Sequence, residues 1–595
     1  MQSRNALRDL ALATFILALS ISGCGRKSAP EEIADTIFIN GGIYTVDAKR
    51  SWAEAAAVRD GRIVAVGRNE EVLPLKGDTT RVVDLAGRMA LPGFHDSHVH
   101  VAAAGLEEMQ CPLNDLQTVE AILHAVGACA SRNQDEWIVG SGWDLSLFES
   151  SSPRKELLDQ AAPGRAVILW GADGHSAWAS SRALEVAAVN AKTPDPENGK
   201  IEHDARTGEP SGTLRETAID LVMDKVPEPS GELRIAALKR GLGHVSEVGI
   251  TSFIEASVGE SDFDAFKSVA ESGELPAKVR LSITYGMFGS EDFEKLLARR
   301  TEVAGPRLKA DAIKIFVDGV LEGETAALLS PYLTRPGYSG SITMPAADLD
   351  AAVTRFDGMG LQVHMHAIGD AAVRAGLDAF AAARAKNGVK DNRHHISHLQ
   401  LIDAADIPRF KELGVAANFQ SFWAWPDDYI LKLNIPQVGP ERVQRMYPIG
   451  SVQRAGGRIV GGSDWSVSTV NPLAAMEVAI TRQDPDNVRT DVLNESERVD
   501  LATMIAAYTI EGTVAVEQGG DPLHPSGPSR LLRVDMESGT SSEVVSTKGR
   551  VTDLAVDSTG THLLWVEGGN LRWSVDDEGA TLPGDFIAAS WMSAA

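Results

Sequence analysis

The chain has 595 residues, of which 44% are hydrophobic and 23% are charged, and this ordinary globular composition excludes a disordered or fibrous protein. Such a length suits one large barrel with additions rather than one small domain. The 82 acidic residues against 56 basic residues give a formal net charge of −26, which argues against a nucleic-acid-binding protein because phosphate contacts need a basic face.

The N-terminus has the pattern of an export signal. Arg4 and Arg8 precede an apolar run from Leu10 to Ile21, which is too short to span a bilayer, since that takes about 20 residues, but is typical of a signal peptide. Small residues then precede Cys24, as in a bacterial lipobox. We therefore expect residues 1–23 to be a lipoprotein signal peptide. Cys24 would then be lipidated and would anchor the exported protein on the periplasmic or cell-surface side of a bacterial membrane. A plain secretory signal with an incidental cysteine is the alternative.

Residues 24–34 read as a tether, and residues 35–90 read as a small β domain. In the second segment, short apolar alternations are separated by turn signals. Asp60 and Gly61 stand between two such alternations, and this dipeptide is a strong signal for a two-residue β-hairpin turn.

Strand-like apolar runs alternate with helical patterns from residue 91 to residue 515. This alternation predicts an α/β fold, a (β/α)8 TIM barrel. The eight runs are 94–101, 249–257, 278–286, 312–319, 361–369, 394–401, 414–421 and 457–465.

A long excursion, about 101–245, separates the first run from the second. It has strand-like pieces of its own, so we expect a subdomain inserted after the first barrel strand, over the barrel mouth. Cys111 and Cys129 lie in this excursion. In an oxidising compartment they could form a disulfide, or they could remain two buried thiols.

Residues 519–595 form a β-rich tail that begins with a Pro/Gly-rich linker. Its turn-separated strands, including "DSTGTHLLWV", resemble one blade of a β-propeller. We favour a foreign blade-like fragment that docks loosely. The alternative is that 551–557 pairs with the 35–90 sheet and completes the small β domain.

The segment "LPGFHDSHVH" concentrates metal-binding side chains. Alternate residues of a strand share a face, so Asp96, His98 and His100 point to one side. Two imidazoles at the C-terminal end of a barrel strand can reach one metal ion. An isolated His-x-His is weak, since single histidines are commonly structural.

The same kind of residue recurs at other strand ends. "VHMHAIGD" places His364 and His366 on one face, "RHHISH" ends the sixth run with His398, and "GGSDW" ends the eighth run with Asp464. Imidazole with carboxylate suits zinc or a similar divalent ion.

These motifs together resemble the amidohydrolase superfamily of metal-dependent hydrolases, in the bacterial branch related to N-acyl amino-acid deacylases and exoenzyme-regulator-like proteins. The resemblance covers about residues 35–515 and includes "GSGWD", "ADGHSAW", "GEPSGTLRE", "GITSFIEA" and "IKIFVDG" in the family's order. It implies one or two divalent ions per chain, with zinc as the first candidate. The implied ligands are His98, His100, His366, His398, Asp464 and a carbamylated Lys314.

Lys314 itself is informative because its strand position points into the barrel, where a bare ammonium is costly. Reaction with carbon dioxide would turn it into an anionic ligand that bridges two metals. An ion pair between Lys314 and Asp318 is the alternative.

Four further residues are candidate substrate contacts. Trp143, Asp144 and His175 lie in the excursion, and the resemblance implies that such loops cover the active site, although they could instead anchor the subdomain. Gln420 ends the seventh run and faces the barrel mouth.

The sequence therefore predicts a metal-dependent hydrolase that cleaves a non-peptide C–N bond of a small molecule, such as an N-acyl or cyclic amide. Asp464 would act as the general base for a metal-activated water. The alternatives are an inactive surface-anchored binding or regulatory lipoprotein, and a metal-dependent deaminase, isomerase or esterase on the same site. A homo-oligomer is compatible with the sequence.

Overall fold

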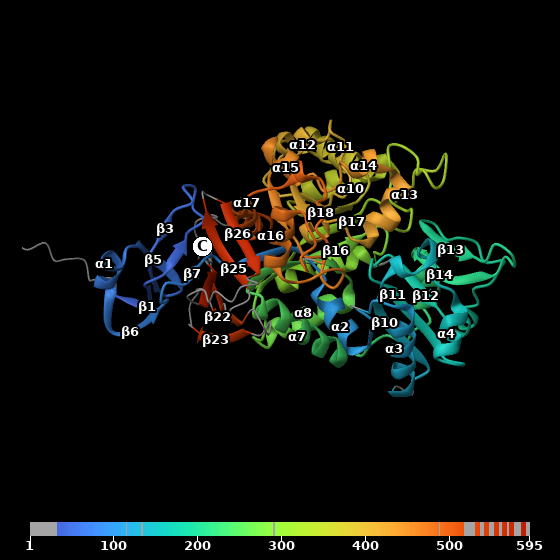
Figure 1. The fold of residues 1–595 in the computed structure, drawn as a ribbon, viewed down its shortest axis with the longest axis horizontal. Helices are drawn as coiled ribbons and strands as arrows, with labels where there is room; N and C mark the ends of the chain where they lie inside the picture. The colour runs from blue at the N-terminus through green and yellow to red at the C-terminus, as the bar shows by residue number, and fades with distance from the viewer. Residues whose placement is uncertain are drawn as a thin grey trace, which may run out of the picture.

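The computed structural model describes residues 33–516, except for 115, 133–134, 290–291 and 487, together with the backbone of six tail strands (Figure 1). The predicted signal peptide and Cys24 lie outside the described residues. Within the described part of the chain, no helix is long and apolar enough to cross a membrane.

A parallel sheet of eight strands forms the centre of the molecule, and its strands follow one another in chain order. They are β8 (Phe94–Val99), β15 (Ile250–Val258), β16 (Lys278–Tyr285), β17 (Leu308–Phe316), β18 (Gln362–Ala367), β19 (His395–His398), β20 (Ala416–Phe419) and β21 (Ile459–Gly461). At the ends of β8 and β21, the Asp464 N–H donates to the carbonyl of His98 at 2.8 Å, and the His100 N–H donates to the carbonyl of Trp465 at 2.9 Å. These bonds join the first and last strands, so the predicted TIM barrel is confirmed.

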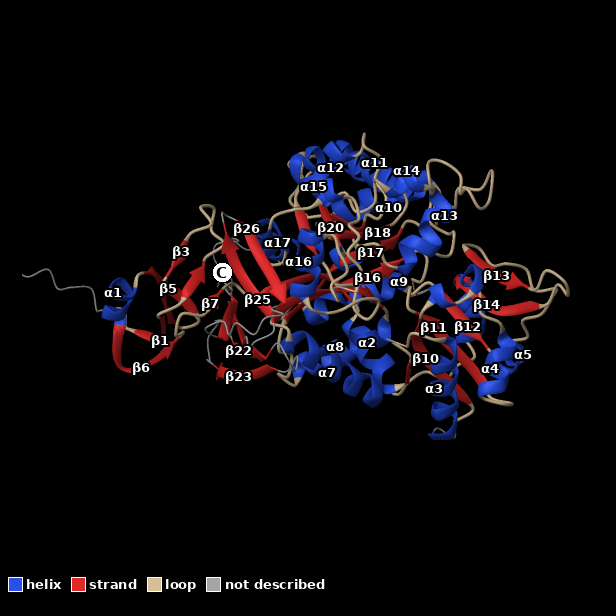
Figure 2. Cartoon of the chain, viewed as in Figure 1, coloured by secondary structure: helices blue, strands red, loops and turns tan. Residues whose placement is uncertain are grey.

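Helices surround the barrel, whereas the two ends of the molecule are mostly strands (Figure 2). The surrounding helices include α7 (Gly231–Glu247), α8 (Glu260–Glu271), α9 (Phe293–Arg299), α10 (Ala346–Gly358), α11 (Asp370–Asn387), α12 (Ile407–Leu413), α15 (Ile449–Arg454), α17 (Leu501–Ala507) and α18 (Ile510–Val516).

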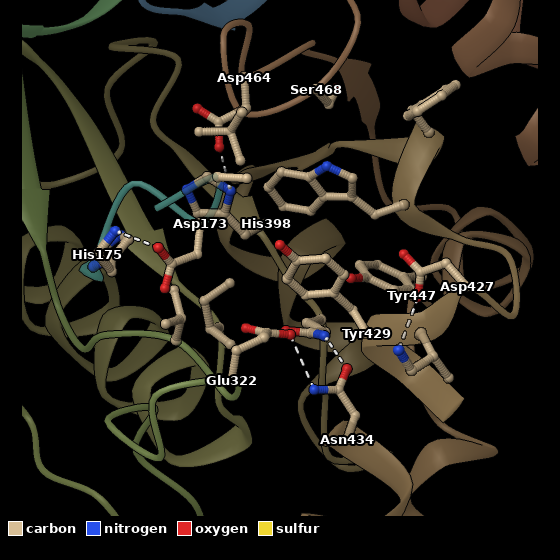
Figure 3. A pocket seen from close by; sticks show the side chains of 18 of the residues that line it. Asp173, His175, Glu322, His398, Asp427, Tyr429, Asn434, Tyr447, Asp464 and Ser468 are labelled. Atoms are coloured by element: carbon tan, nitrogen blue, oxygen red, sulfur yellow. Dashed lines mark hydrogen bonds and ion pairs between the residues drawn. The ribbon is translucent and has the colours of Figure 1, made fainter. Parts of the chain in front are cut away.

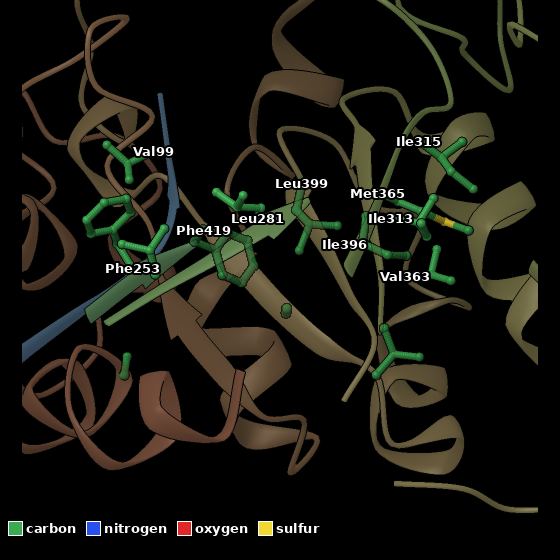
Figure 4. Packing of buried hydrophobic residues seen from close by; sticks show 14 of the residues in the cluster. Val99, Phe253, Leu281, Ile313, Ile315, Val363, Met365, Ile396, Leu399 and Phe419 are labelled. Carbon is green, nitrogen blue, oxygen red and sulfur yellow. The ribbon is translucent and has the colours of Figure 1, made fainter. Parts of the chain in front are cut away.

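Strand alternation separates the core from the site. In β18, Val363 and Met365 belong to the apolar core, part of which is shown in Figure 4, and the intervening His364 and His366 take the opposite face. Gly376 of α11 permits close packing there, because a Cβ at this position would lie 2.9 Å from the sulfur of Met365. The barrel interior is thereby left to polar side chains.

The N-terminal β domain contains two sheets, in the orders β5-β4-β1-β6 and β3-β2-β7. Its strands are β1 (Ala34–Ile39), β2 (Gly42–Tyr44), β3 (Trp52–Ala53), β4 (Ala55–Arg59), β5 (Arg62–Gly67), β6 (Lys76–Asp84) and β7 (Met89–Ala90). Asp60 and Gly61 join the antiparallel β4 and β5 with φ values of 49° and 72°. The predicted two-residue hairpin is confirmed, since positive φ at both positions is typical of this turn.

A six-stranded sheet, in the order β13-β14-β12-β11-β10-β9, is inserted between β8 and β15. Its strands are β9 (Cys111–Pro112), β10 (Trp137–Trp143), β11 (Ala166–Gly171), β12 (Ser176–Ala179), β13 (Gly199–His203) and β14 (Pro210–Glu216). A disulfide joins Cys111 of β9 to Cys129 of α3 (Val119–Arg132), so the structure has the paired form of these cysteines rather than two thiols. Helix α2 (Val101–Met109) leads from the barrel into this insertion.

The tail strands form a four-stranded sheet, in the order β23-β22-β24-β27, and a separate hairpin of β25 and β26. Their bounds are β22 (Arg530–Asp535), β23 (Ser541–Ser546), β24 (Thr552–Asp557), β25 (His562–Glu567), β26 (Asn570–Val575) and β27 (Asp585–Ser590). Because β22 and β24 are parallel, this sheet does not show the antiparallel blade of a propeller. Strand β24 pairs with β22 and β27 of the tail itself.

Candidate metal centre and adjoining pocket

Three buried side chains converge where barrel strands end. His98 comes from β8, His398 ends β19, and Asp464 follows β21; one potential ligand atom of each lies within 4.8 Å of those of the other two. The distance from His98 Nε2 to Asp464 Oδ1 is 3.1 Å, and the distance from His398 Nδ1 to Asp464 Oδ2 is 3.8 Å. Two imidazoles and a carboxylate at this spacing can hold a divalent ion.

The three other predicted ligands surround this cluster. His100 Nε2 lies 3.1 Å from Asp464 Oδ1, and Lys314 Nζ lies 3.5 Å from His98 Nε2. The ring centroids of His366 and His398 are 4.4 Å apart. The barrel therefore brings all six predicted ligands to one place.

The polar atoms of the cluster fit a metal ion. Among the described residues, neither ring nitrogen of His398 has a hydrogen-bond partner, although both are buried, and its Nδ1 lies 3.8 Å from Asp464 Oδ2. A buried polar atom without a partner costs about 1–3 kcal/mol. A cation between them would satisfy these atoms, and nitrogen with carboxylate oxygen is a donor set that zinc accepts.

Protonation also favours metal binding. Burial, together with Lys314, lowers the pKa of His98 to about 3, and burial lowers the pKa values of His366 and His398 well below the usual range. These imidazoles are therefore neutral, as metal ligation requires. Burial alone would raise the pKa of Asp464, but its contacts with His98 and His100, whose Nε2 atoms each lie 3.1 Å from its Oδ1, outweigh burial and hold that pKa well below its ordinary value.

Lys314 is fully buried, and its ammonium has no carboxylate at contact distance among the described residues. The alternative ion pair with Asp318 is not formed, because the Asp318 carboxylate accepts the backbone N–H groups of Ala327, Ile368 and Gly369. Burial lowers the pKa of Lys314 to about 7. A neutral amine is the form that reacts with carbon dioxide, so the site is compatible with a carbamate.

Below the cluster, His364 orients His98. His364 Nε2 lies 2.8 Å from His98 Nδ1 and 3.0 Å from the hydroxyl of Ser397, and its Nδ1 lies 3.2 Å from the hydroxyl of Ser282. Holding one nitrogen of a ligand histidine directs the other toward the metal. The sequence placed His364 on the inner face of its strand but did not indicate this role, which depends on contacts between strands.

A cavity of about 220 Å³ adjoins the cluster. His175 lies at its wall (Figure 3), and its Nδ1 is 2.7 Å from a carboxylate oxygen of Glu216, which lies behind it. Burial would lower the pKa of His175, but Glu216 outweighs this effect and raises the pKa to about 9. The structure therefore places a protonated imidazole at the pocket, where a substrate contact at His175 was expected.

Two expected substrate contacts, Trp143 and Asp144, are not among the residues that line this cavity, so their contact with a substrate remains a prediction. Trp143 is buried against Phe148 and Trp178, and its indole N–H donates to the carbonyl of Leu169 at 2.9 Å. Asp144 accepts the backbone N–H of Ser146 and caps a turn. In the structure both residues make contacts within the inserted subdomain. The indole of Trp143 packs in the aromatic core of that subdomain rather than at the mouth of the barrel.

Gln420 also lies outside the pocket lining. It is fully buried, and its side-chain amide donates to Asn418 Oδ1 at 3.2 Å. The side chain stays inside the barrel, and a substrate contact at Gln420 remains a prediction.

The remaining wall of the pocket comes mainly from the loop after β20, which the sequence analysis did not assign. It contributes five aromatic side chains, one carboxylate, one amide and one aliphatic side chain, namely Phe422, Trp423, Trp425, Tyr429, Tyr447, Asp427, Asn434 and Ile430. The run "SFWAWPDDY" directly after a barrel strand was the available signal, since loops at the C-terminal ends of barrel strands build such sites.

Comparison with known proteins agrees with this geometry. The sequence profile of the amidohydrolase family matches residues 81–520. The chain belongs to the amidohydrolase family. The resemblance inferred from the strand-end motifs is therefore confirmed at the level of the family.

Relatives of this amidohydrolase cover most of its length. Protein LONG AFTER FAR-RED 3 of Arabidopsis thaliana is 30% identical over 495 residues, 81% of this chain and 84% of the relative. N-substituted formamide deformylase of Arthrobacter pascens is 26% identical over 510 residues, 82% and 91% of the two chains. The structure of an uncharacterized metal-dependent hydrolase from Pyrococcus horikoshii matches with a TM-score of 0.63 at 23% identity, covering 81% of this chain and 93% of that chain, which supports the fold.

Proposed function

We propose that this amidohydrolase cleaves a non-peptide C–N bond of a small amide, with His98, His100, His366, His398, Asp464 and a carbamylated Lys314 as ligands of one or two zinc ions. The observation that carries the proposal is the convergence of His98, His398 and Asp464 beside an open cavity. When bound, a divalent ion would lower the pKa of a coordinated water to about 7 and would polarise the carbonyl of the substrate.

The residues of the chain supply the proton transfers and the positioning. Asp464 is held ionised by the histidine rings around it, so it can accept the proton of the attacking water and pass it to the leaving nitrogen. His175, kept protonated by Glu216, can donate a hydrogen bond to an oxygen of the substrate. Together they place a base and a donor on one cavity.

The choice of an amide is supported by a relative whose name states that it acts on N-substituted formamides. The same ligands also serve deaminases, isomerases and esterases, and an inactive anchored regulator would keep them as well. We favour an enzyme over an inactive regulator because Asp464 lies beside the cavity, as turnover requires. We favour an amide over the other substrates because of the named substrate of that relative.

We propose in addition that the protein is exported and attached to the membrane through a lipid on Cys24. The Cys111–Cys129 disulfide supports this, since disulfides persist in oxidising compartments. Mass spectrometry of the membrane fraction should find a lipidated N-terminal Cys24. An unprocessed chain in the cytosol would contradict export.

A screen of N-formyl amines, N-acyl amines, cyclic imides and lactones tests the activity. Asp464→Asn should keep the fold but lower kcat by about 100-fold or more on any substrate found, because an amide cannot accept the proton. Asp464→Asn activity within a few-fold of wild type would contradict its role, and cleavage of lactones alone would replace the amide with an ester.

A further inference from the structure

The charges on the pocket wall are of one sign at the end away from His175. The carboxylates at that end are Glu322 and Asp427, whereas Asp173 and Asp464 lie on the side of His175, and the lining includes neither a lysine nor an arginine. Among the residues described by the structure, no salt bridge reaches Glu322 or Asp427. The cationic group of the wall is His175, which is already paired with Glu216.

Glu322 is held by a fixed network. Its Oε1 accepts a hydrogen bond from Asn434 Nδ2 at 2.9 Å, and Asn434 Oδ1 accepts one from Gln400 Nε2 at 2.9 Å. The Gln400 contact fixes the orientation of the Asn434 amide, and both amides are buried. Burial raises the pKa of Glu322 because no cation compensates the ionised form. The carboxylate of Glu322 therefore lies at the pocket in a fixed position, with no cationic side chain paired to it among the described residues.

Asp427 lies on the same wall. Its Oδ1 accepts the backbone N–H of Ile430 at 2.8 Å, and burial together with the nearby Glu322 raises its pKa to about 7. Capping of the turn explains the Ile430 contact. It does not explain why a second carboxylate without a salt bridge of its own faces the same cavity, since the nearby Arg489 pairs with Asp428.

Aromatic rings complete this part of the pocket. Figure 3 shows Tyr429, Tyr447 and Asp427 on one side and His175, His398 and Asp464 on the other. Trp423 and Trp425 also line the cavity. Aromatic faces combined with carboxylates bind ammonium and guanidinium groups, because the ring quadrupole attracts a cation.

We propose that the substrate is an amide that carries a positively charged group, an ammonium or guanidinium, seated against Glu322, Asp427 and the aromatic rings. Such a group would supply the missing counter-charge, whereas a carboxylate would meet repulsion and lose its hydration without a partner. The cleavage of the amide rests on the proposed function, but the preference in binding does not.

Three acetamides of similar size test the preference: N-acetylputrescine is cationic, N-acetylpentylamine is neutral, and N-acetyl-5-aminopentanoate is anionic. Equilibrium dialysis against the full-length, metal-loaded protein gives their affinities, and mass spectrometry of the same samples reports any cleavage. The cationic probe should bind at least about tenfold more tightly than the neutral one, and the anionic probe most weakly. Equal or tighter binding of the neutral or anionic probe, or no binding of the cationic probe, would overturn the proposal.

Variants locate the effect. Glu322→Gln should weaken the cationic probe by at least about tenfold and change the neutral probe by less than about twofold. Glu324→Gln is the matched control, since it stands on the same loop, pairs with Arg335 at 3.6 Å and does not line the pocket; it should change neither affinity. An equal loss in both variants would contradict the assignment. If Glu322→Gln does not fold, the ranking of the probes on the wild type decides.

The same samples separate the two proposals. Cleavage of the probes without tighter binding of the cationic one would refute the proposed preference for a cationic substrate but would support the proposed amide hydrolysis. Tight binding of the cationic probe without cleavage of any amide would contradict the proposed amide hydrolysis but would support the proposed binding of a cation.

Discussion

Replacing His364 with phenylalanine should lower the affinity for the metal although His364 is not one of the predicted ligands. The substitution keeps an aromatic ring in a fully buried position but removes the contacts to His98 Nδ1 at 2.8 Å, Ser397 at 3.0 Å and Ser282 at 3.2 Å. His98 then loses the partner that orients it. Loss of such a partner lowers metal affinity by about 10- to 100-fold, which corresponds to about 1.4–2.7 kcal/mol. Each polar atom that loses its partner lowers the free energy of unfolding by about 1–3 kcal/mol more.

His395→Phe is the matched control for this prediction. His395 is equally buried and its ring centroid lies 4.1 Å from that of His364, yet neither of its nitrogens has a hydrogen-bond partner among the described residues. Its replacement should change metal affinity by less than about threefold. Competition with a chromophoric chelator measures both variants, and circular dichroism verifies folding. The reasoning is refuted if folded His364→Phe binds metal like the wild type, or if His395→Phe loses as much affinity.

Three further predictions follow from buried groups. Reduction of the Cys111–Cys129 disulfide, which links residues 18 apart in sequence, should lower the free energy of unfolding by about 3 kcal/mol in denaturant titrations, and an unchanged midpoint would contradict this. Glu216 raises the pKa of His175 from its usual 6.5 to about 9, so this pair stabilises the fold fully below about pH 6.5 and loses its contribution as the pH rises through about 9. Glu216→Gln should flatten that part of the stability profile, and an unaltered profile would contradict the pairing. Apoprotein reloaded with metal should be activated by bicarbonate through Lys314; activation that survives in Lys314→Ala would rule out the carbamate.

The barrel and its metal cluster could be predicted because their signals are local. Each of the eight strands is an apolar run, and His98, His366, His398 and Asp464 stand at or just after the ends of such runs. Parallel strands of a barrel bring their C-terminal ends together, so the position in each strand was enough.

The pocket wall could not be predicted in the same way. The side chains of Glu322 and Asn434 come from different loops, and the contact between them depends on how those loops fold over the barrel. Trp143 shows the converse, since an aromatic residue at a strand end looks the same in sequence whether it faces a substrate or the core of an insertion. The pairing of Cys111 with Cys129 depended likewise on the fold of the inserted subdomain.

Anomalous diffraction at the zinc edge from crystals of protein purified without chelator tests the metal centre most directly. The account predicts an anomalous peak bounded by His98, His398 and Asp464, at about 2.0–2.2 Å from their ligand atoms. A metal-supplemented crystal with no peak among these three residues, or with its metal held elsewhere, would contradict it.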